Sequence, residues 1–253
     1  MIYDENRLRS LLPKEVASLR VFDEIDSTSS EARRYAACGG SDLALFISDR
    51  QSGGRGRMGR SFYSPSGAGV YLSILLPQVE FTPDTLLLTT AAAVAVRRAA
   101  LRVTGVDTDI KWVNDLYYRE RKVCGILCEM LTEPRTIIIG VGVNLYASEL
   151  PSEISGIAGA LLDAPSIGVT REALAAAIVK EILDIRQELT DGAFMEEYRR
   201  HSAVLGREIS YIQNGVAHTG RAVDINERGH LIVRCDNGEK IALSSGEISV
   251  SIK

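Results

Sequence analysis

A glycine- and arginine-rich segment between two apolar runs constrains this chain more than any other feature. Residues 51–67 read QSGGRGRMGRSFYSPSG, preceded by LALFIS from Leu43 and followed by VYLSILL from Val70. The two apolar runs have the length and composition of buried strands. Glycine permits close backbone approach to a ligand, and arginine presents forked, permanently charged donors to carboxylates and phosphates. The segment therefore predicts a loop that binds an anionic, phosphate-bearing ligand; the alternative is a flexible surface hairpin with incidental arginines.

The same loop contains GRGRMG, which matches the pattern GxGxxG, but the dinucleotide-binding interpretation is rejected. That fingerprint requires a helix to begin at its third glycine, whereas SFYSPSG follows here and Pro65 with its flanking glycines forbids a regular helix. The pattern GxxxxGK[ST] does not occur in the chain, which excludes a P-loop. Any nucleotide site must therefore be built from side chains and loop amides.

Charge and residue usage narrow the class of protein. The 253 residues carry a net charge of −4, which argues against nucleic-acid binding through a broad basic surface. The polar, acidic N-terminus is no secretory signal, and no apolar stretch has the length of a membrane span. We therefore expect a cytoplasmic protein without nucleic-acid or membrane partners.

The cysteines and histidines do not predict a metal or hydrolytic site. The four cysteines are scattered, and the three histidines all lie in the C-terminal third of the chain. Free thiols in a reducing compartment are expected in place of a zinc site or a disulfide framework. Neither a Ser-His-Asp triad nor a histidine metal site is predicted, and no metal-ligating residues are assigned.

Hydrophobic periodicity predicts an α+β fold with a mixed, mainly antiparallel sheet. A short helix broken at Pro13 is expected near the N-terminus. Strands are predicted at 19–25, at 43–48 and 70–76 around the loop, and in three consecutive segments at 109–118, 123–133 and 136–146. Helices are predicted at 26–37 with Asp26 or Ser27 as N-cap, at 83–103 with Pro83 near its start, at 170–189 and at 192–203.

The C-terminal part of the chain has a different texture. From Gly206 short alternating strands follow one another, with turns at 214–215, 227–229 and 236–238. This pattern predicts a small all-β barrel and two domains, residues 1–205 and 206–253. Residues 146–168 are rich in Ser, Gly and Pro without a firm period, so a mobile, lid-like segment is expected there.

Two further clusters stand at the ends of predicted strands. Lys111, Trp112, Asn114 and Asp115 precede a charged turn, and Lys122 opens the strand after it. A hairpin would bring Lys122 back beside this cluster, where a lysine could neutralise the charge that grows as a carboxylate attacks a phosphate. The alternative is an ordinary charged hairpin on the surface.

The second cluster is DSTSSEA, at a strand-to-helix corner. Its hydroxyls could hold a polar ligand, or could serve only to cap the helix. One sheet could bring this corner, the loop, the Lys122 hairpin and GVGVN (140–144) together.

At these stretches the chain resembles the biotin protein ligases, also called biotin–acetyl-CoA-carboxylase ligases, from about Val21 to the C-terminus. The resemblance is carried by DSTSSEA, QSGGRGRMGRSFYSPSGAGVYLSILL, KWVNDLYYRERKVCGIL, IIIGVGVNL and SSGEISV. It implies a class II synthetase-like catalytic domain followed by an SH3-like barrel. It also implies two steps: biotin and ATP, with Mg²⁺ as activator, form biotinyl-5′-adenylate, which then acylates a lysine of a biotin carboxyl carrier domain.

The resemblance further implies roles for individual residues. Lys122 would contact the biotin carboxylate and the phosphate, Arg57 would restrain the reactive intermediate, and Lys111 and Asp115 would serve the nucleotide and metal side and help deprotonate the incoming lysine. These four are the implied catalytic residues. The implied biotin- and adenylate-binding residues come from the same motifs: Ser27, Thr28, Ser29, Gln51, Gly54, Arg55, Gly56, Arg57, Asn114, Lys122, Gly125 and Asn144.

The chain departs from the family pattern in several places. Ser29 stands where Asn is usual and Val113 where Pro is usual, and the adenine-covering Trp after GVGVN is missing because Trp112 is the single tryptophan. An aliphatic residue such as Ile157 or Leu161 is expected to cover the adenine instead. The residues before Val21 are too few for the helix-turn-helix domain of some members, so a monofunctional ligase without operator binding is expected.

Two other functions stay open from the sequence. A lipoate or octanoate ligase would share the fold and the acyl-adenylate chemistry, although the GRGRMGR loop counts against it. A non-catalytic biotin- or nucleotide-binding protein would not need Arg57, Lys111, Asp115 and Lys122, whereas Ser29 in place of Asn keeps this alternative open. An exposed strand could pair two copies into a homodimer or dock the carrier.

Overall fold

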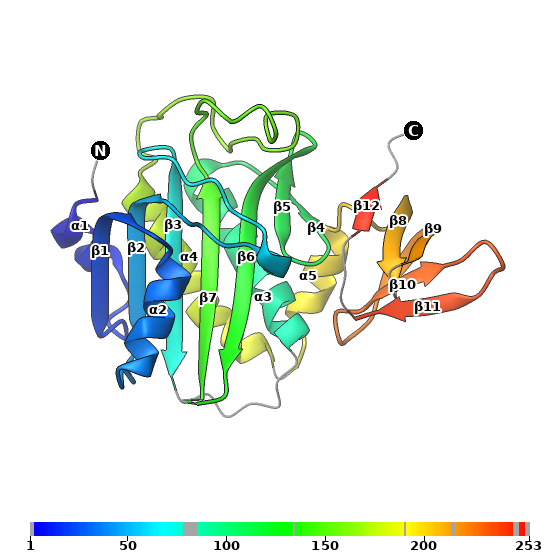
Figure 1. The fold of residues 1–253 in the computed structure, drawn as a ribbon, viewed down its shortest axis with the longest axis horizontal. Helices are drawn as coiled ribbons and strands as arrows, with labels where there is room; N and C mark the ends of the chain where they lie inside the picture. The colour runs from blue at the N-terminus through cyan, green and yellow to red at the C-terminus, as the bar shows by residue number, and fades with distance from the viewer. Residues whose placement is uncertain are drawn as a thin grey trace.

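Seven strands form the central mixed sheet, in the order β1-β2-β3-β7-β6-β5-β4 (Figure 1). The computed structural model describes residues 3–77, 85–133, 135–189, 191–213, 216–244 and 248–250. β1 runs parallel to β2, and the other neighbouring pairs are antiparallel, so the predicted α+β class is confirmed. The strands are β1 (Ser18–Ile25), β2 (Ala44–Gln51), β3 (Gly69–Pro77), β4 (Asp109–Lys111), β5 (Asp115–Tyr118), β6 (Arg121–Leu131) and β7 (Thr136–Asn144).

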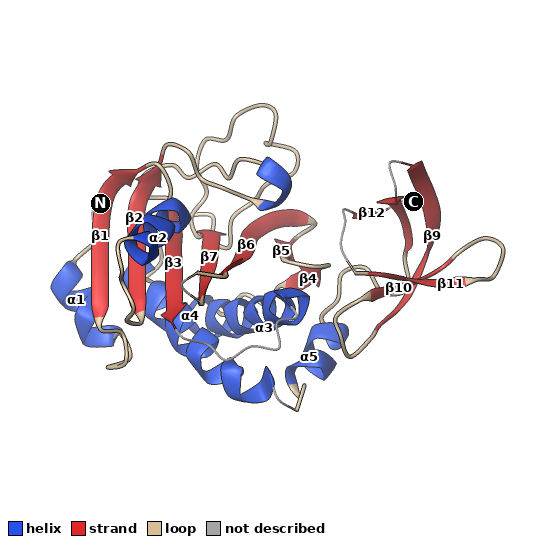
Figure 2. Cartoon of the chain, turned by 60° about the horizontal axis from the view of Figure 1, so that its bottom comes forward, coloured by secondary structure: helices blue, strands red, loops and turns tan. Residues whose placement is uncertain are grey.

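Helices cover both faces of this sheet (Figures 1 and 2). α2 (Thr28–Ala37) packs on one face, where its alanines meet Phe46 of β2 and Ile138 of β7. α3 (Thr85–Thr104) and α4 (Arg171–Ile185) lie against the other face, together with α1 (Glu5–Leu11) and α5 (Phe194–Arg200). Pro83, expected near the start of α3, lies outside the described residues, and no helix in the described part is both long and apolar enough to cross a membrane.

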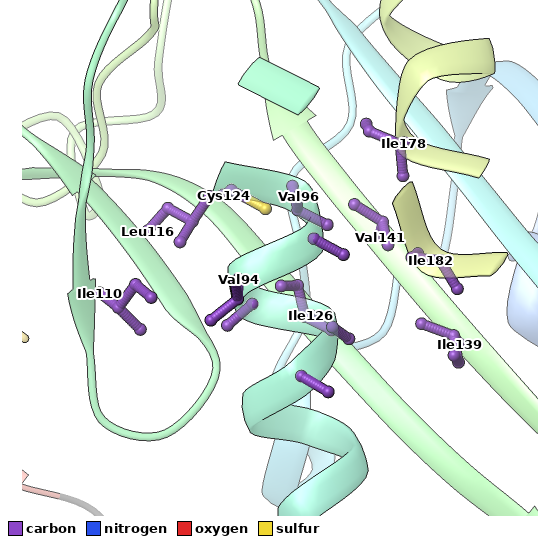
Figure 3. Close-up of a cluster of buried hydrophobic side chains, with 14 of the residues drawn as sticks. Val94, Val96, Ile110, Leu116, Cys124, Ile126, Ile139, Val141, Ile178 and Ile182 are labelled. Carbon is purple, nitrogen blue, oxygen red and sulfur yellow. The ribbon is translucent and has the colours of Figure 1, made fainter. Parts of the chain in front are cut away.

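The main core lies between the sheet and the pair α3–α4. Figure 3 shows Ile139 and Val141 of β7 beside Ile178 and Ile182 of α4, and all four are buried. Because successive side chains of a strand point to opposite faces, residues 140 and 142 of β7 face away from this core. Both are glycines, so no side chain of β7 rises from the opposite face of the sheet at these two positions.

The structure corrects one predicted strand. Residues 109–118 form two strands, β4 and β5, joined by a tight turn at residues 112–114 whose Trp112–Val113 peptide bond is cis. The turn is stabilised by partners far away in the chain. The Tyr198 hydroxyl of α5 donates to the Val113 carbonyl at 3.1 Å, and the Asn114 amide donates to the Ile126 carbonyl at 2.7 Å. Local periodicity carries no signal of such contacts.

A second, antiparallel sheet follows α5, with the order β11-β10-β9-β8-β12. Its strands are β8 (Glu208–Gln213), β9 (Val216–Ile225), β10 (Leu231–Arg234), β11 (Lys240–Leu243) and β12 (Ile248–Val250). The predicted all-β texture is confirmed. The pairings of these described strands leave β11 and β12 at the two edges, so the expected closure into a barrel is not seen among them. The turn expected at 214–215 lies outside the described residues.

Candidate active site

A cavity of about 130 Å³ opens beside the N-terminus of α2. Its lining brings together all the site residues implied by the sequence except Gly54 and Asn144. Those that line it are Ser27, Thr28, Ser29, Gln51, Arg55, Gly56, Arg57, Lys111, Asn114, Asp115, Lys122 and Gly125. The predicted meeting of these motifs at one place on the sheet is therefore confirmed.

One end of the cavity is a wall of hydroxyl and amide groups. Ser27 is the N-cap of α2, and its hydroxyl accepts the Ser30 N–H at 3.4 Å. Thr28 and Ser29 begin the helix, are buried, and line the cavity. The Gln51 carbonyl oxygen accepts the Thr28 backbone N–H at 2.9 Å. Ser27 thus caps the helix and also lines the cavity, together with the two residues that follow it.

The floor of the cavity is made by glycines of neighbouring strands. Gly125 of β6 lies opposite Gly142 of β7, and Leu127 lies opposite Gly140. The Phe62 ring rests on this floor: a Cβ at Gly142 would lie 2.5 Å from it and one at Gly125 3.2 Å. Glycine in a strand commonly marks such a close approach. The alternate glycines of GVGVN were the available sequence signal for this floor, whereas Phe62 was not predicted.

The opposite end is a charged corner. The predicted hairpin is confirmed, and it places Lys122 Nζ 2.8 Å from Asp115 Oδ1, with side-chain exposures of 29% and 20%. Lys111 Nζ lies 5.3 Å from the centre of the Tyr117 ring and donates to its hydroxyl at 3.5 Å. Burial, with a smaller contribution from the charge of Asp115, raises the pKa of Tyr117 to about 12. Tyr117 therefore stays protonated beside the lysine.

The glycine–arginine loop closes over this corner. Arg57 Nη1 donates to the Asn114 side-chain oxygen at 3.2 Å, which joins the loop to the turn between β4 and β5. The described lining of the cavity is strongly positive. It contains one carboxylate, Asp115, and five cationic side chains: Arg55, Arg57, Arg60, Lys111 and Lys122. Preorganised positive charge of this kind favours an anion, or charge that develops during a reaction.

The loop also folds on itself. Backbone bonds from Phe62 N to Gly54 O at 2.9 Å and from Gly56 N to Arg60 O at 2.7 Å make it an irregular hairpin. Gly54 is needed for this fold, because a Cβ there would lie 2.3 Å from the Phe62 carbonyl oxygen. This glycine therefore serves the loop's own packing and does not line the cavity.

Asn144 lines a neighbouring cavity of about 460 Å³, together with Arg121 and the segment after β7. That segment is tied to β6: Lys122 N donates to the Ile157 carbonyl at 2.8 Å, and Gly159 N to the Lys122 carbonyl at 2.9 Å. Ile157 is 57% exposed, whereas Leu161 is 3% exposed and part of the core. Of the two aliphatic residues expected to cover an adenine, Leu161 is therefore excluded by burial.

The C-terminal sheet reaches the site in two places. Ile248 of β12 lines the first cavity. The Trp112 indole, which lines it too, donates to the Gly229 carbonyl at 2.8 Å. No sequence signal predicts these contacts, since they depend on how the two sheets pack.

Comparison with known proteins supplies the family. Residues 40–144 match the Biotin/lipoate A/B protein ligase family, and residues 204–251 match the Biotin protein ligase C terminal domain. A "Bifunctional ligase/repressor BirA" of Bacillus subtilis is 32% identical over 251 residues, which span 93% of this chain and 76% of that protein. A "Biotin–[acetyl-CoA-carboxylase] ligase" of Mycobacterium tuberculosis is 28% identical, over 97% of this chain and 94% of the relative.

Solved structures agree with the sequence relatives. The biotin protein ligase from Aquifex aeolicus in complex with biotin and ATP superimposes with a TM-score of 0.81 at 28% identity. The match covers 93% of this chain and all of that one, 100%. With these relatives, and with the glycine–arginine loop and the Lys122 hairpin meeting at one cavity, the chain belongs to the biotin protein ligase family.

Proposed function

We propose that the chain activates biotin with ATP to biotinyl-5′-adenylate and transfers the biotinyl group to a lysine of a biotin carboxyl carrier domain. The observation that carries this proposal is the arrangement of one cavity. The Lys122–Asp115 ion pair lies at one end of it, covered by Arg57, and the hydroxyls of residues 27–29 lie at the other end. The glycines of β6 and β7 lie between the two ends. The match of residues 204–251 to the biotin ligase C-terminal domain favours biotin over lipoate or octanoate. The set of cations at the corner favours a catalyst over a non-catalytic binding protein.

In the first step a biotin carboxylate oxygen attacks the α-phosphorus of ATP. The bond from that phosphorus to the bridging oxygen breaks, and pyrophosphate leaves. Two anions must approach each other, so the reaction needs positive charge at the point of attack. Lys122 supplies it, with Arg57 holding the product beneath the loop, where exclusion of water protects the mixed anhydride.

Mg²⁺ is implied by the family, and the residues present fit a cation that arrives with the nucleotide. No cluster of three or more metal-ligating side chains occurs among the described residues. Asp115 is the carboxylate among the described lining residues of the first cavity, and its Oδ1 lies 2.8 Å from Lys122 Nζ. Mg²⁺ commonly uses one or two carboxylates together with substrate phosphates and water. Asp115 would hold it, and the ion would supply further charge neutralisation.

The two cavities together suit an extended acyl-adenylate. Along β6 the first cavity is lined by Lys122 and the second by Arg121; along β7 the first is lined by Gly142 and the second by Asn144. We place biotin over the glycine floor and the nucleotide in the second cavity. Ile157, which is exposed and adjoins Ala158 of the lining of the second cavity, is the residue that we expect to cover the base.

In the second step the carrier lysine attacks the acyl carbon, the bond to the phosphate oxygen breaks, and AMP leaves. Asp115 would take the proton of the attacking amine. The relatives named biotin–[acetyl-CoA-carboxylase] ligase support a carboxylase carrier as the protein substrate. A homodimer stays a prediction, which sedimentation of the purified chain would check.

The direct test incubates the protein with biotin, MgATP and a biotin carboxyl carrier domain, and reads the carrier by mass spectrometry. We expect a gain of one biotinyl group that requires ATP. A gain with lipoate or octanoate but not with biotin would refute the proposal. Biotin binding without any covalent transfer would favour the non-catalytic alternative.

A further inference from the structure

Ser73 stands directly behind the hydroxyl wall of the first cavity. It lies within β3 and is 0% exposed, and its hydroxyl contacts two residues that line the cavity. Its Oγ is 2.8 Å from Thr28 Oγ1 and 2.9 Å from Ser29 Oγ. Ser73 lies within the stretch 51–76 that carries the family resemblance, but it is not among the implied site residues and does not line the cavity.

The direction of these hydrogen bonds follows from one backbone donor. The Thr28 backbone N–H can only donate, so the Gln51 atom that it contacts at 2.9 Å must be the carbonyl oxygen. The Thr28 hydroxyl donates to that same oxygen at 3.2 Å. A hydroxyl has a single proton, so Thr28 must accept from Ser73, and Ser73 in turn must accept from Ser29.

The chain of donors therefore runs from Ser29 through Ser73 and Thr28 to the Gln51 carbonyl. Beyond it, the Gln51 amide donates to Ser64 Oγ at 2.9 Å, and that hydroxyl donates to the Phe62 carbonyl at 3.0 Å. The proton of Ser29 is used inside the wall, so the group that Ser29 offers to the cavity is a lone pair. Ser29 Oγ also lies close to the glycine floor, since a Cβ at Gly140 would be 2.5 Å from it.

We infer that Ser73 is a positioning residue which makes Ser29 a hydrogen-bond acceptor for an N–H of the substrate's ureido ring. The inference rests on the proposed function, since biotin supplies a cyclic urea with two N–H donors. A serine at position 29, where the family usually has Asn, can do this because Ser73 binds its proton. Without Ser73 the Ser29 hydroxyl can turn its proton toward the cavity, where it opposes the substrate N–H.

The test compares Ser73→Ala, Ser29→Ala and the double variant with the wild-type chain by calorimetric titration. The ligands are biotin, desthiobiotin and MgATP. Desthiobiotin keeps the ureido ring and lacks the thioether. Ser48→Ala is the matched control, because Ser48 is also 0% exposed, lies on the neighbouring strand β2, and donates locally to the Arg50 carbonyl at 2.5 Å.

Each single variant is expected to weaken biotin and desthiobiotin by the same factor, about five- to tenfold for one lost hydrogen bond. MgATP affinity should stay unchanged, and so should all affinities of Ser48→Ala. The double variant should lose little more than either single one, since both break one chain of bonds. In the adenylation assay KM for biotin should rise while kcat stays within about twofold.

A biotin affinity of Ser73→Ala within about twofold of wild type would overturn the inference. So would an equal loss of MgATP affinity in this variant. So would a loss of biotin affinity in the double variant that equals the sum of the two single losses. If Ser73→Ala melts early, its biotin and MgATP affinities, measured below its melting temperature, still decide, because a structural loss would weaken both ligands and the loss of one hydrogen bond to the ureido ring would weaken biotin alone. A wild-type chain that fails to bind biotin would overturn the proposed function as well. Normal wild-type binding with an unaffected Ser73→Ala overturns only the role of Ser73.

Discussion

At the scale of single residues, Lys122 is the group on which the proposed chemistry depends most. It is held at the start of β6 by its bridge to residues 157–159 and by its ion pair with Asp115. A lysine that is partly exposed and held in this way presents its charge to the cavity without reorganisation. Such preorganised charge is commonly the largest single contribution to rate enhancement.

Lys122→Ala is therefore expected to lower the rate of biotin-dependent pyrophosphate release by about 10²- to 10³-fold. Lys180→Ala is the matched control, because Lys180 is an exposed lysine that pairs with Asp184 on α4. The control should keep the wild-type rate. A Lys122→Ala enzyme that adenylates biotin at full rate would refute the assignment.

Gly142 tests the glycine floor. A Cβ at this position would lie 2.5 Å from the Phe62 ring, so the ring or the strand must move. Gly142→Ala should cost about 1–3 kcal/mol of stability by overpacking and weaken biotin binding, measured by urea unfolding and calorimetry. Gly156→Ala is the control, since nothing lies within 4 Å of a Cβ there. Equal unfolding free energies and equal biotin affinities of the two variants would mean that the glycine floor tolerates a side chain.

At the scale of elements, a buried ion pair anchors the returning end of the glycine–arginine loop. Asp49 of β2 accepts from Arg171 Nη1 of α4 at 2.5 Å and from the Gly67 N–H at 3.2 Å, and it also accepts from the Ser66 hydroxyl. Burial alone would raise the pKa of Asp49, but the hydrogen bonds from Ser66 and Arg171 outweigh it and lower the pKa. The loop that covers the cavity is thus fixed at one end to the helix layer.

Asp49→Asn should destabilise the fold near neutral pH by about 3 kcal/mol, because Arg171 loses its partner charge while still buried. An aspartate with a lowered folded pKa stabilises above its unfolded pKa of about 3.9, and this stabilisation is lost as pH falls through the folded pKa. The difference between wild type and variant should therefore be constant from about pH 5 to 8 and shrink below about pH 4. Urea unfolding across this range measures it.

Asp184→Asn is the control for this pH series. Asp184 is exposed and pairs with Lys180 at the surface of α4, where an ion pair contributes little. Its unfolding free energy should follow that of wild type at every pH. A difference between wild type and Asp49→Asn that persists unchanged into acid would contradict the role given to the Asp49 carboxylate.

At the scale of the whole molecule, the second sheet supports the turn that carries the charged corner. Trp112 bonds to Gly229 across the junction of the two sheets, and Arg199 Nη2 of α5 pairs with Glu227 at 2.6 Å in the same turn of the second sheet. Lys111 and Asp115 flank the supported turn. The boundary between two domains at residues 205 and 206 stays a prediction, with the two separate family matches in its favour.

Trp112→Phe should lower the unfolding free energy by about 1 kcal/mol, the value of one hydrogen bond with its carbonyl left unpaired. It should also raise KM for ATP, because the turn between Lys111 and Asp115 loses a support. Circular dichroism and pyrophosphate release measure the two effects. Tyr63→Phe, at an exposed aromatic, is the control and should change neither. An unchanged KM would show that the second sheet does not position the corner.

The sequence alone determined the class of the fold, and its resemblance to a family implied a set of candidate site residues. Strand alternation, the loop composition and the KWVND–Lys122 spacing are local patterns, and they predicted the mixed sheet and the hairpin, whereas the family resemblance implied half of the residues that line the cavity. The turn at residues 112–114 could not be predicted, because its hydrogen-bond partners Tyr198 and Gly229 lie far away in the chain.

Only the tertiary structure decided which neighbours each polar or small residue meets. Gly54 turned out to serve the loop, Asn144 a second cavity, and Leu161 the core. Ser73 and Phe62 entered the site because β3 and the loop meet α2 and the glycines of β6 and β7. The type of a residue limits which hydrogen bonds and contacts its side chain can make. The packing of distant strands determines which of them form, and no local stretch of sequence contains that information.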